Sequence, residues 1–240
     1  MEATSATPAR ILRRALSLAA ALVILKVTAA VVWNYRNYVP PDFHVDFLRG
    51  RQAYFFGAYG WSFYIHILTG PFTLVAGLLL MSERFRQRLP RWHRRLGRVQ
   101  VLTILLALAP SGLWMALYAQ AGLSGQLGFS ALAIATAVCT AMGWRTAVQR
   151  RYESHRRWMT RSYALLCSAV VIRLIGGLAT VTVPSEGLDQ FTPWLCWLAP
   201  LAVLEWVFAQ TKRNAKRSPE MGRYAKEPRS RTESQLLAGG

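Results

Sequence analysis

Four ionisable side chains interrupt long apolar stretches of this sequence: Lys26, His66, Arg173 and Glu205. A charge at the centre of a bilayer costs at least about 2.5–3.5 kcal/mol on insertion scales, so each such group needs a partner or a cavity. At about 1.5 Å of rise per residue, all four are predicted at a similar depth, roughly 10 to 18 Å below one membrane surface. They predict a structural pair of Arg173 with Glu205, a polar cavity for a small ligand or ion, or a haem site that uses His66 and a second ligand the sequence does not reveal.

A second set of candidate groups lies in a His-Arg-Arg tripeptide that occurs twice, starting at His93 and at His155. Two neutral imidazoles could ligate the iron of a b-type haem while arginines pair with its propionates. In the other interpretation Arg94, Arg156 and Arg161 contact lipid phosphates, and the histidines cap helix ends. Two histidines alone make an incomplete shell for a metal ion, so no metal site is predicted.

The elements that must position these groups are membrane-spanning helices. Of the 240 residues 53% are hydrophobic and only 17% are charged, a composition typical of a membrane protein. Six stretches approach the roughly 20 apolar residues that cross a bilayer. They are residues 15–33, 58–81, 98–119, 126–148, 160–182 and 193–210. The predicted fold is therefore all-α, a polytopic transmembrane helix bundle with six spans.

The distribution of basic residues predicts the orientation of the spans. Most of the 29 Lys and Arg residues fall in the two tails and in the links after the second and fourth spans. The other side has only Arg36, Arg49 and Arg51, in the long link of residues 34–57. Because cytoplasmic segments retain Lys and Arg, both termini are predicted to be cytoplasmic. The net charge of +18 thus reflects orientation, and no nucleic-acid partner is expected.

The chain is expected to consist of three parts. Residues 1–14 form a basic cytoplasmic N-terminus, residues 15–210 the membrane domain, and residues 211–240 a basic tail. The tail has almost no apolar runs, so we expect it to be disordered and attracted to anionic lipid. The first span has a second interpretation as a cleaved signal peptide, which would leave five spans.

At the two histidine motifs the sequence also resembles a known family. The matching stretches are Gly70-Pro71, His93-Arg94-Arg95-Leu96-Gly97-Arg98 and His155-Arg156-Arg157-Trp158-Met159-Thr160-Arg161-Ser162-Tyr163-Ala164, followed by Arg173. They resemble bacterial predicted membrane proteins called domain of unknown function 2306, over roughly residues 58–182. The resemblance implies a multi-span protein of the bacterial inner membrane whose pattern includes His66, His93, His155 and Arg173. It implies no particular reaction.

The sequence leaves three functions open. No phosphate loop, His-Glu-x-x-His, Cys-x-x-Cys or nucleophile with base and orienter is present, so an enzyme is not expected. The first hypothesis is a bundle that binds or moves a small ligand or proton through an outward-facing polar cavity. In it Lys26 and Arg173 supply positive charge, Glu205 a counter-charge, and His66 a group that titrates near neutrality. The alternatives are a haem b electron carrier and a structural or accessory membrane protein, with the bilayer and anionic headgroups as partners.

Overall fold

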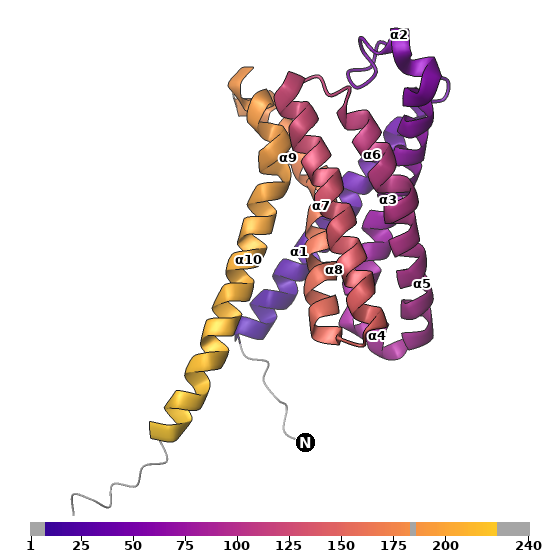
Figure 1. The fold of residues 1–240 in the computed structure, drawn as a ribbon. Helices are drawn as coiled ribbons and strands as arrows, with labels where there is room; N and C mark the ends of the chain where they lie inside the picture. Colours follow the sequence, from indigo (N-terminus) through magenta and orange to yellow (C-terminus); the bar gives the residue numbers. More distant parts are fainter. Residues whose placement is uncertain (1–7, 183–185, 225–240) are drawn as a thin grey trace, which may run out of the picture. The chain divides into compact units, whose positions relative to one another are not determined.

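The computed structural model describes residues 8–182 and 186–224, which form helices joined by short links (Figure 1). No β-strand occurs among these residues. Six helical stretches are long and apolar enough to span a membrane, which confirms the predicted all-α, six-span fold. They are Arg14–Asn37, Gln52–Met81, Pro90–Ala116, Gly122–Val148, Tyr152–Leu178 and Gln190–Asn214.

Several spans are composed of more than one helical element. The elements are α1 (Pro8–Trp33), the 3₁₀-helix η1 (Asn34–Asn37), α2 (Gln52–Tyr54), the π-helix η2 (Phe55–Tyr59), α3 (Gly60–Met81), α4 (Glu83–Arg88), α5 (Pro90–Thr103), the π-helix η3 (Ile104–Leu108), α6 (Ala109–Ala116), α7 (Gly122–Val148), α8 (Tyr152–Leu166), α9 (Ser168–Thr182) and α10 (Glu186–Tyr224). The second span joins α2, η2 and α3, the third joins α5, η3 and α6, and the fifth joins α8 and α9. Segment η2 contains a kink at Gly57, whose backbone is not helical, whereas η3 is a π-helical turn of the kind that is frequent at functional sites.

The third and fifth spans begin earlier than their apolar runs predict. Helix α5 starts at Pro90 and α8 at Tyr152, so His93 and His155 lie on spanning helices and not in links. Proline suits the first turn of a helix, because its missing N–H needs no intrahelical partner there. The arginine-rich first turns lower the local hydropathy, although long basic side chains can extend from a helix toward the membrane surface.

The chain divides into two compact units, Met1–Pro200 and Leu201–Gly240. The first unit contains α1 to α9 and the beginning of α10. In the second unit α10 continues to Tyr224, so a helix occupies the first part of the segment expected to be a disordered tail. Residues 225–240 of that tail lie outside the described residues.

Side-chain hydrogen bonds and close packing connect α3 to both α5 and α8. The buried Gln100 donates from Nε2 to the backbone oxygen of Thr73 at 2.9 Å. Tyr163 donates its hydroxyl to the backbone oxygen of Leu74 at 3.1 Å. Its ring lies against Gly77, where a Cβ atom would overlap the ring carbons. A glycine at this position therefore allows α8 to approach α3.

The substitution Gly77→Ala is expected to lower the free energy of unfolding by about 1–3 kcal/mol, because the added methyl group overlaps Tyr163. Thermal unfolding can be followed with a thiol-reactive dye, since Cys139 and Cys196 are buried in the folded chain. The matched control is Gly70→Ala on the same helix, where a Cβ meets nothing within 4 Å. It should be neutral or stabilise by up to about 1 kcal/mol. Equal losses in both variants would contradict the steric explanation.

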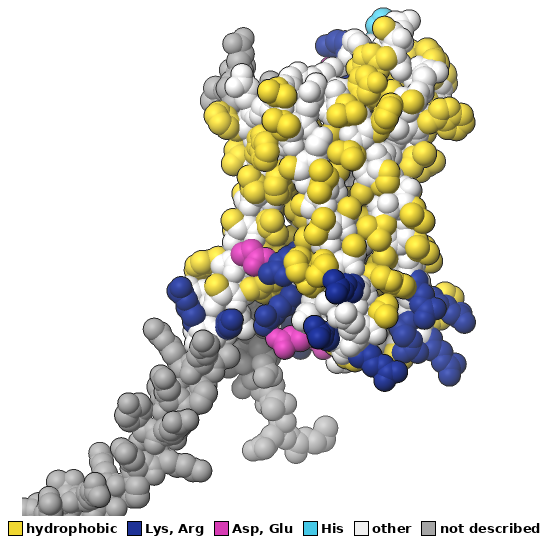
Figure 2. Space-filling view, in the orientation of Figure 1, with side chains coloured by type: hydrophobic (Ala, Val, Ile, Leu, Met, Phe, Trp, Pro, Cys, Tyr) yellow, Lys and Arg dark blue, Asp and Glu magenta, His cyan; other side chains and the backbone are white. Residues whose placement is uncertain are grey.

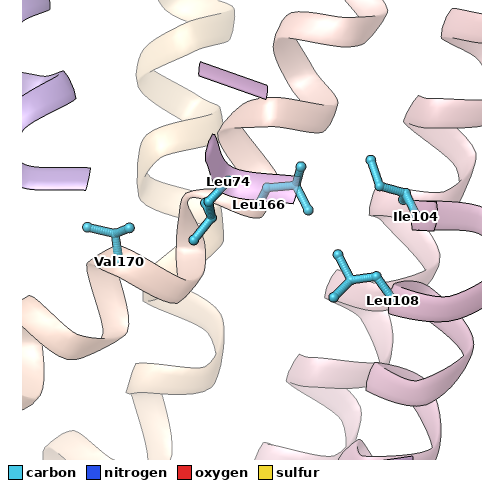
Figure 3. Close-up of a cluster of buried hydrophobic side chains, with 5 residues drawn as sticks. All are labelled: Leu74, Ile104, Leu108, Leu166 and Val170. Carbon is cyan, nitrogen blue, oxygen red and sulfur yellow. The ribbon is translucent and has the colours of Figure 1, made fainter. Parts of the chain in front are cut away.

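Five buried aliphatic side chains form a core where three spans meet. They are Leu74, Ile104, Leu108, Leu166 and Val170 (Figure 3). Ile104 and Leu108 belong to the π-helix η3, and Leu166 and Val170 lie on either side of the break between α8 and α9 at Cys167. The core thus coincides with irregular backbone in two of its three helices.

A second cluster is aromatic and involves the link that precedes α3. Its buried members are Leu48, Phe55, Tyr59 and Phe63, and the partly buried rings of Tyr38, Phe43, Tyr54, Tyr64 and Tyr118 pack against them. Several ring pairs have edge-to-face geometry, among them Phe43 with Phe55 at a centroid distance of 5.4 Å. This packing gives residues 38–59 a fixed structure although they contain little regular helix.

Basic side chains of the first unit gather at one end. Figure 2 shows Lys and Arg concentrated where α4 and the beginnings of α5 and α8 lie, while hydrophobic side chains cover the sides of the unit. We call residues 84–98 and 145–161 the basic rim. They include the basic residues that the sequence predicts in the links after the second and fourth spans.

Candidate functional site

A cavity of about 1410 Å³ lies in the first unit. Residues of α1, α3, α6, α7, α8 and α9 line it, together with η1, η2, η3, the links before α2 and α7, and the beginning of α10. Its ionisable lining residues are Tyr35, Arg51, Tyr59, His66 and Arg173. The cavity thus brings together two of the four predicted residues, His66 and Arg173.

His66 is held by the Pro-Ser-Gly sequence at residues 110–112. Its Nδ1 atom lies 3.3 Å from the hydroxyl of Ser111, and that hydroxyl donates to the backbone oxygen of Leu108 at 3.1 Å. Because the one serine proton is used there, Ser111 must accept, and Nδ1 of His66 carries a proton. Nε2 is then the acceptor of the neutral ring. A Cβ at Gly112 would lie 3.0 Å from Cε1 of His66, so only glycine leaves the ring its full space.

Arg173 lies on α9 with an exposed side chain that lines the cavity. It donates from Nη1 to the backbone oxygen of Ala169, one turn earlier on its own helix, at 2.8 Å. Tyr35, Tyr38 and His66 are close enough to interact with it electrostatically. Among the side chains that the structure describes, no carboxylate lies within 4.0 Å of Arg173. Its positive charge therefore lacks a described counter-ion.

Tyr35 closes a gap that a proline opens in the wall of the cavity. Pro71 lies inside α3 and has no N–H to donate to the backbone oxygen of Ile67, four residues earlier. The hydroxyl of Tyr35 donates to that oxygen. In a membrane, protein groups or trapped water must satisfy a carbonyl that a proline leaves without its donor. Tyr35 does so here, and it thereby joins η1 to α3.

Replacing Tyr35 with Phe is expected to destabilise the fold by about 1–3 kcal/mol, since the Ile67 oxygen loses its donor. The same substitution in a Pro71→Ala background should cost less, because the introduced alanine supplies a backbone N–H to Ile67. Thermal unfolding of the four variants forms a double-mutant cycle. Additive effects, with no coupling between positions 35 and 71, would contradict this assignment.

Arg51 is a cavity residue that sequence reasoning did not identify. It is 6% exposed, and it donates from Nε to the Phe47 oxygen at 2.7 Å and from Nη1 to the Tyr118 oxygen at 3.0 Å. Its guanidinium lies 4.9 Å from the ring centroid of Phe47 and 5.5 Å from that of Tyr59. The sequence does not indicate that a basic residue in a polar link is buried. The burial of Arg51 becomes apparent only from its contact with Tyr118, which lies far along the chain.

The other two predicted cavity residues, Lys26 and Glu205, are not among the described lining residues. Lys26 is exposed and is not among the lining residues. It precedes Thr28, which lines the cavity, by two residues, and at about 3.6 residues per turn the two point to nearly opposite sides of α1. Glu205 is half-buried on α10 in the second unit. The structure therefore assigns neither of them to this site.

The charge of the cavity is one-sided. Arg51 and Arg173 line it, and no Asp or Glu occurs among its lining residues in the described part of the chain. Most of the remaining lining side chains are aliphatic, aromatic or small. An apolar pocket with a few fixed polar groups is the usual form of a small-molecule site. This one is suited to a negatively charged molecule.

At the basic rim the structure brings His93 and His155 within electrostatic range of each other. Nδ1 of His155 lies 2.8 Å from the backbone oxygen of Gly143, whereas Nδ1 of His93 is buried without a hydrogen-bond partner. Among the described residues, no group of three or more His, Cys, Asp and Glu could hold a metal ion. The pair is thus limited to two nitrogen ligands.

Arginines of the basic rim contact nearby acidic and aromatic side chains. Nη2 of Arg156 lies 3.9 Å from Glu83, and the Arg161 guanidinium lies 4.9 Å from the ring centroid of Trp158. Arg94 is exposed and contributes to the positive field around His93.

Fold and cavity define a polytopic α-helical membrane protein with a basic, largely apolar pocket. Residues 63–208 match the family described as "Predicted membrane protein (DUF2306)", and the chain belongs to this family. The match includes His66, His93, His155 and Arg173, whereas Tyr35 and Arg51 precede it. No curated protein and no solved structure matches the chain. The family description states no function.

Proposed function

We propose that the cavity binds a small organic anion. The observation that carries this proposal is the pair of cavity-lining guanidinium groups, Arg51 and Arg173, in a lining without a described carboxylate. Arginine donors match the geometry of carboxylates and phosphates, and a low-dielectric site strengthens the attraction. An uncharged solute would leave the positive charges of Arg51 and Arg173 without a counter-ion.

His66 gives the site a means to link anion binding to a proton. Its Nδ1 is used toward Ser111, so a second proton would bind at Nε2 and make the ring cationic. That charge would favour an anion in the cavity, although Arg173 opposes it electrostatically. The proposal therefore includes binding or movement of the anion together with a proton.

We place the basic rim at the cytoplasmic face of a bacterial inner membrane, because cytoplasmic segments retain Lys and Arg. The link that holds Arg51 then faces outward, and so does the cavity that it lines. Arginines of the rim, among them the exposed Arg94 and Arg156 and the half-buried Arg161, would bind anionic lipid headgroups. Nanodiscs with and without phosphatidylglycerol test this part: anionic lipid should stabilise the wild type more than an Arg94→Gln/Arg156→Gln variant. Equal stabilisation of both would contradict it.

The test of anion binding uses three ligands of one shape and different charge. Benzoate, benzamide and benzylammonium are titrated by calorimetry into the purified full-length protein in neutral lipid nanodiscs. We expect saturable binding of benzoate and none of the other two. The matched control variant is Lys26→Leu, which removes a basic residue outside the cavity and should leave benzoate affinity unchanged. Equal binding of benzamide, or no binding of any ligand, would refute the proposal.

A second candidate function is electron transfer through a b-type haem, supported by the proximity of His93 and His155. The bond of His155 Nδ1 to Gly143 fixes its ring and leaves Nε2 available to iron. A bound haem would supply one-electron chemistry. Protein from haem-replete cells should then show a Soret band that His155→Ala removes. A colourless preparation contradicts this candidate.

A further inference from the structure

The cavity is larger than a simple inorganic anion needs. Drug-sized ligands occupy pockets of about 300–1000 Å³, and this cavity has about 1410 Å³. At Gly70 and Gly176, both in the lining, an added Cβ would meet nothing within 4 Å. The ligand therefore has space for a substantial body beside its charged group.

Charged groups line only part of the length of the cavity. Three lining residues follow one another along the second span: Tyr59, His66 and Leu74. The ring of Tyr59 contacts Arg51, and His66 interacts electrostatically with Arg173. At about 1.5 Å per residue, His66 lies roughly 10 Å beyond Tyr59, and Leu74 roughly 12 Å beyond His66. The cavity therefore has a basic part from Arg51 to His66, and beyond it a deep part that ends at Leu74.

The deep part offers apolar surface. Its lining includes Leu74, Leu108, Leu132, Leu165, Leu166 and Val170. Two hydroxyl groups there, Thr73 and Thr136, donate to backbone oxygens of their own helices at 2.8 and 2.7 Å. Ser168 adds one more hydroxyl. A second charged or strongly polar group of a ligand would find few partners in this part, whereas a hydrocarbon chain would be well accommodated.

Resting on the proposed function, we infer that the ligand is a single-chain anionic amphiphile of the fatty-acid type. Its carboxylate lies beside Arg173 and His66, and its chain extends along the deep part toward Leu74 and Leu166. The five-residue aliphatic core forms the floor of the site, because Leu74, Leu108, Leu166 and Val170 belong to both the core and the lining. Arg51 attracts the carboxylate at the entrance.

The experiment measures binding of radiolabelled dodecanoate to the full-length protein in phosphatidylcholine nanodiscs, with empty nanodiscs subtracted. Affinities are referred to the free aqueous ligand. Dodecanoate is expected to bind at least about tenfold more tightly than benzoate, with octanoate and decanoate in between, since each buried methylene adds up to about fourfold. Dodecanol, which lacks the charge, should not displace dodecanoate.

Two neighbouring substitutions on α7 test where the chain lies. Ala133 lines the cavity, whereas Ile134 is 54% exposed and does not. Ala133→Phe fills the site, so it should remove most of the advantage of dodecanoate over benzoate, while Ile134→Phe should leave it unchanged. If Ala133→Phe fails to fold, the chain-length series in the wild type decides by itself.

The outcomes separate this inference from the proposed function. Benzoate binding without a gain for longer chains would overturn the amphiphile and leave the anion site standing. Absence of binding for every anion would refute both. Dodecanol binding as tightly as dodecanoate would overturn the inference, because the charge would then contribute nothing. Loss of dodecanoate binding in phosphatidylglycerol nanodiscs would also overturn it, since a two-chain lipid would then be the occupant.

Discussion

Arg173→Leu is expected to lower benzoate affinity by about 10- to 150-fold. Hydrogen bonds to charged groups contribute about 1.5–3 kcal/mol, and each 1.4 kcal/mol corresponds to a factor of ten in the dissociation constant. Arg173 lines the cavity, and in the described residues its positive charge faces no carboxylate that could already neutralise it. The leucine side chain removes this charge and keeps an apolar wall. Calorimetric titration of both proteins measures the change.

The same substitution should leave the melting temperature unchanged or raise it. Arg173 donates its one described hydrogen bond to Ala169 on its own helix, so leucine breaks no described hydrogen bond between helices. A charged side chain within a span is also costly, by at least about 2.5–3.5 kcal/mol at the bilayer centre. Arg173→Lys is the conservative control, and it should retain part of the affinity because it keeps the charge but loses the planar fork. A lower melting temperature with unchanged benzoate affinity would make Arg173 a structural residue.

The number of spans and the level of the cavity residues were predictable from the sequence. Hydropathy along the chain defines the six spans, and the regular rise of a helix converts position into depth. The sequence therefore predicts a similar depth for His66 and Arg173, although it does not show that their helices are neighbours. The structure confirms the spans and brings these two residues to one cavity.

Depth alone does not determine which way a side chain points. Lys26 has the same predicted depth as His66, yet the phase of α1 turns it away from the cavity that Thr28 lines. Hydropathy also does not predict the early starts of α5 and α8, because arginines reduce the hydropathy of a segment without ending its helix. To predict which residues of a helix face a cavity, one must know at least one residue of that helix that lines it. The sequence alone does not supply this information.

The long link of residues 34–57 was the least predictable part of the site. Its aromatic side chains pack with α3 and Tyr118 into a cluster, and this packing buries Arg51. Neither periodicity nor hydropathy reports such a contact, because it joins residues far apart in the sequence. The distribution of basic residues predicts only on which side of the membrane Arg51 lies. Its role depends on tertiary contacts that form outside the regular helices.

Replacing Arg51 with leucine should lower the stability of the protein, whereas Arg173→Leu should leave it unchanged or raise it. Two backbone oxygens, those of Phe47 and Tyr118, lose their charged donors, at about 1–3 kcal/mol each. Loss of the guanidinium contacts with the rings of Phe47 and Tyr59 adds about 0.5–2 kcal/mol. We therefore expect a loss of several kcal/mol, visible as a clear fall in melting temperature with the thiol-reactive dye.

The control for Arg51 lies two residues earlier in the same link. Arg49 is exposed, pairs with Asp46 at 3.1 Å and does not line the cavity, so Arg49→Leu should change stability by less than about 1 kcal/mol. Arg51→Lys should recover only part of the loss, because one ammonium group cannot donate along both directions of the fork. If Arg49→Leu and Arg51→Leu lower the melting temperature equally, the link responds to its net charge and the buried contacts of Arg51 do not stabilise it.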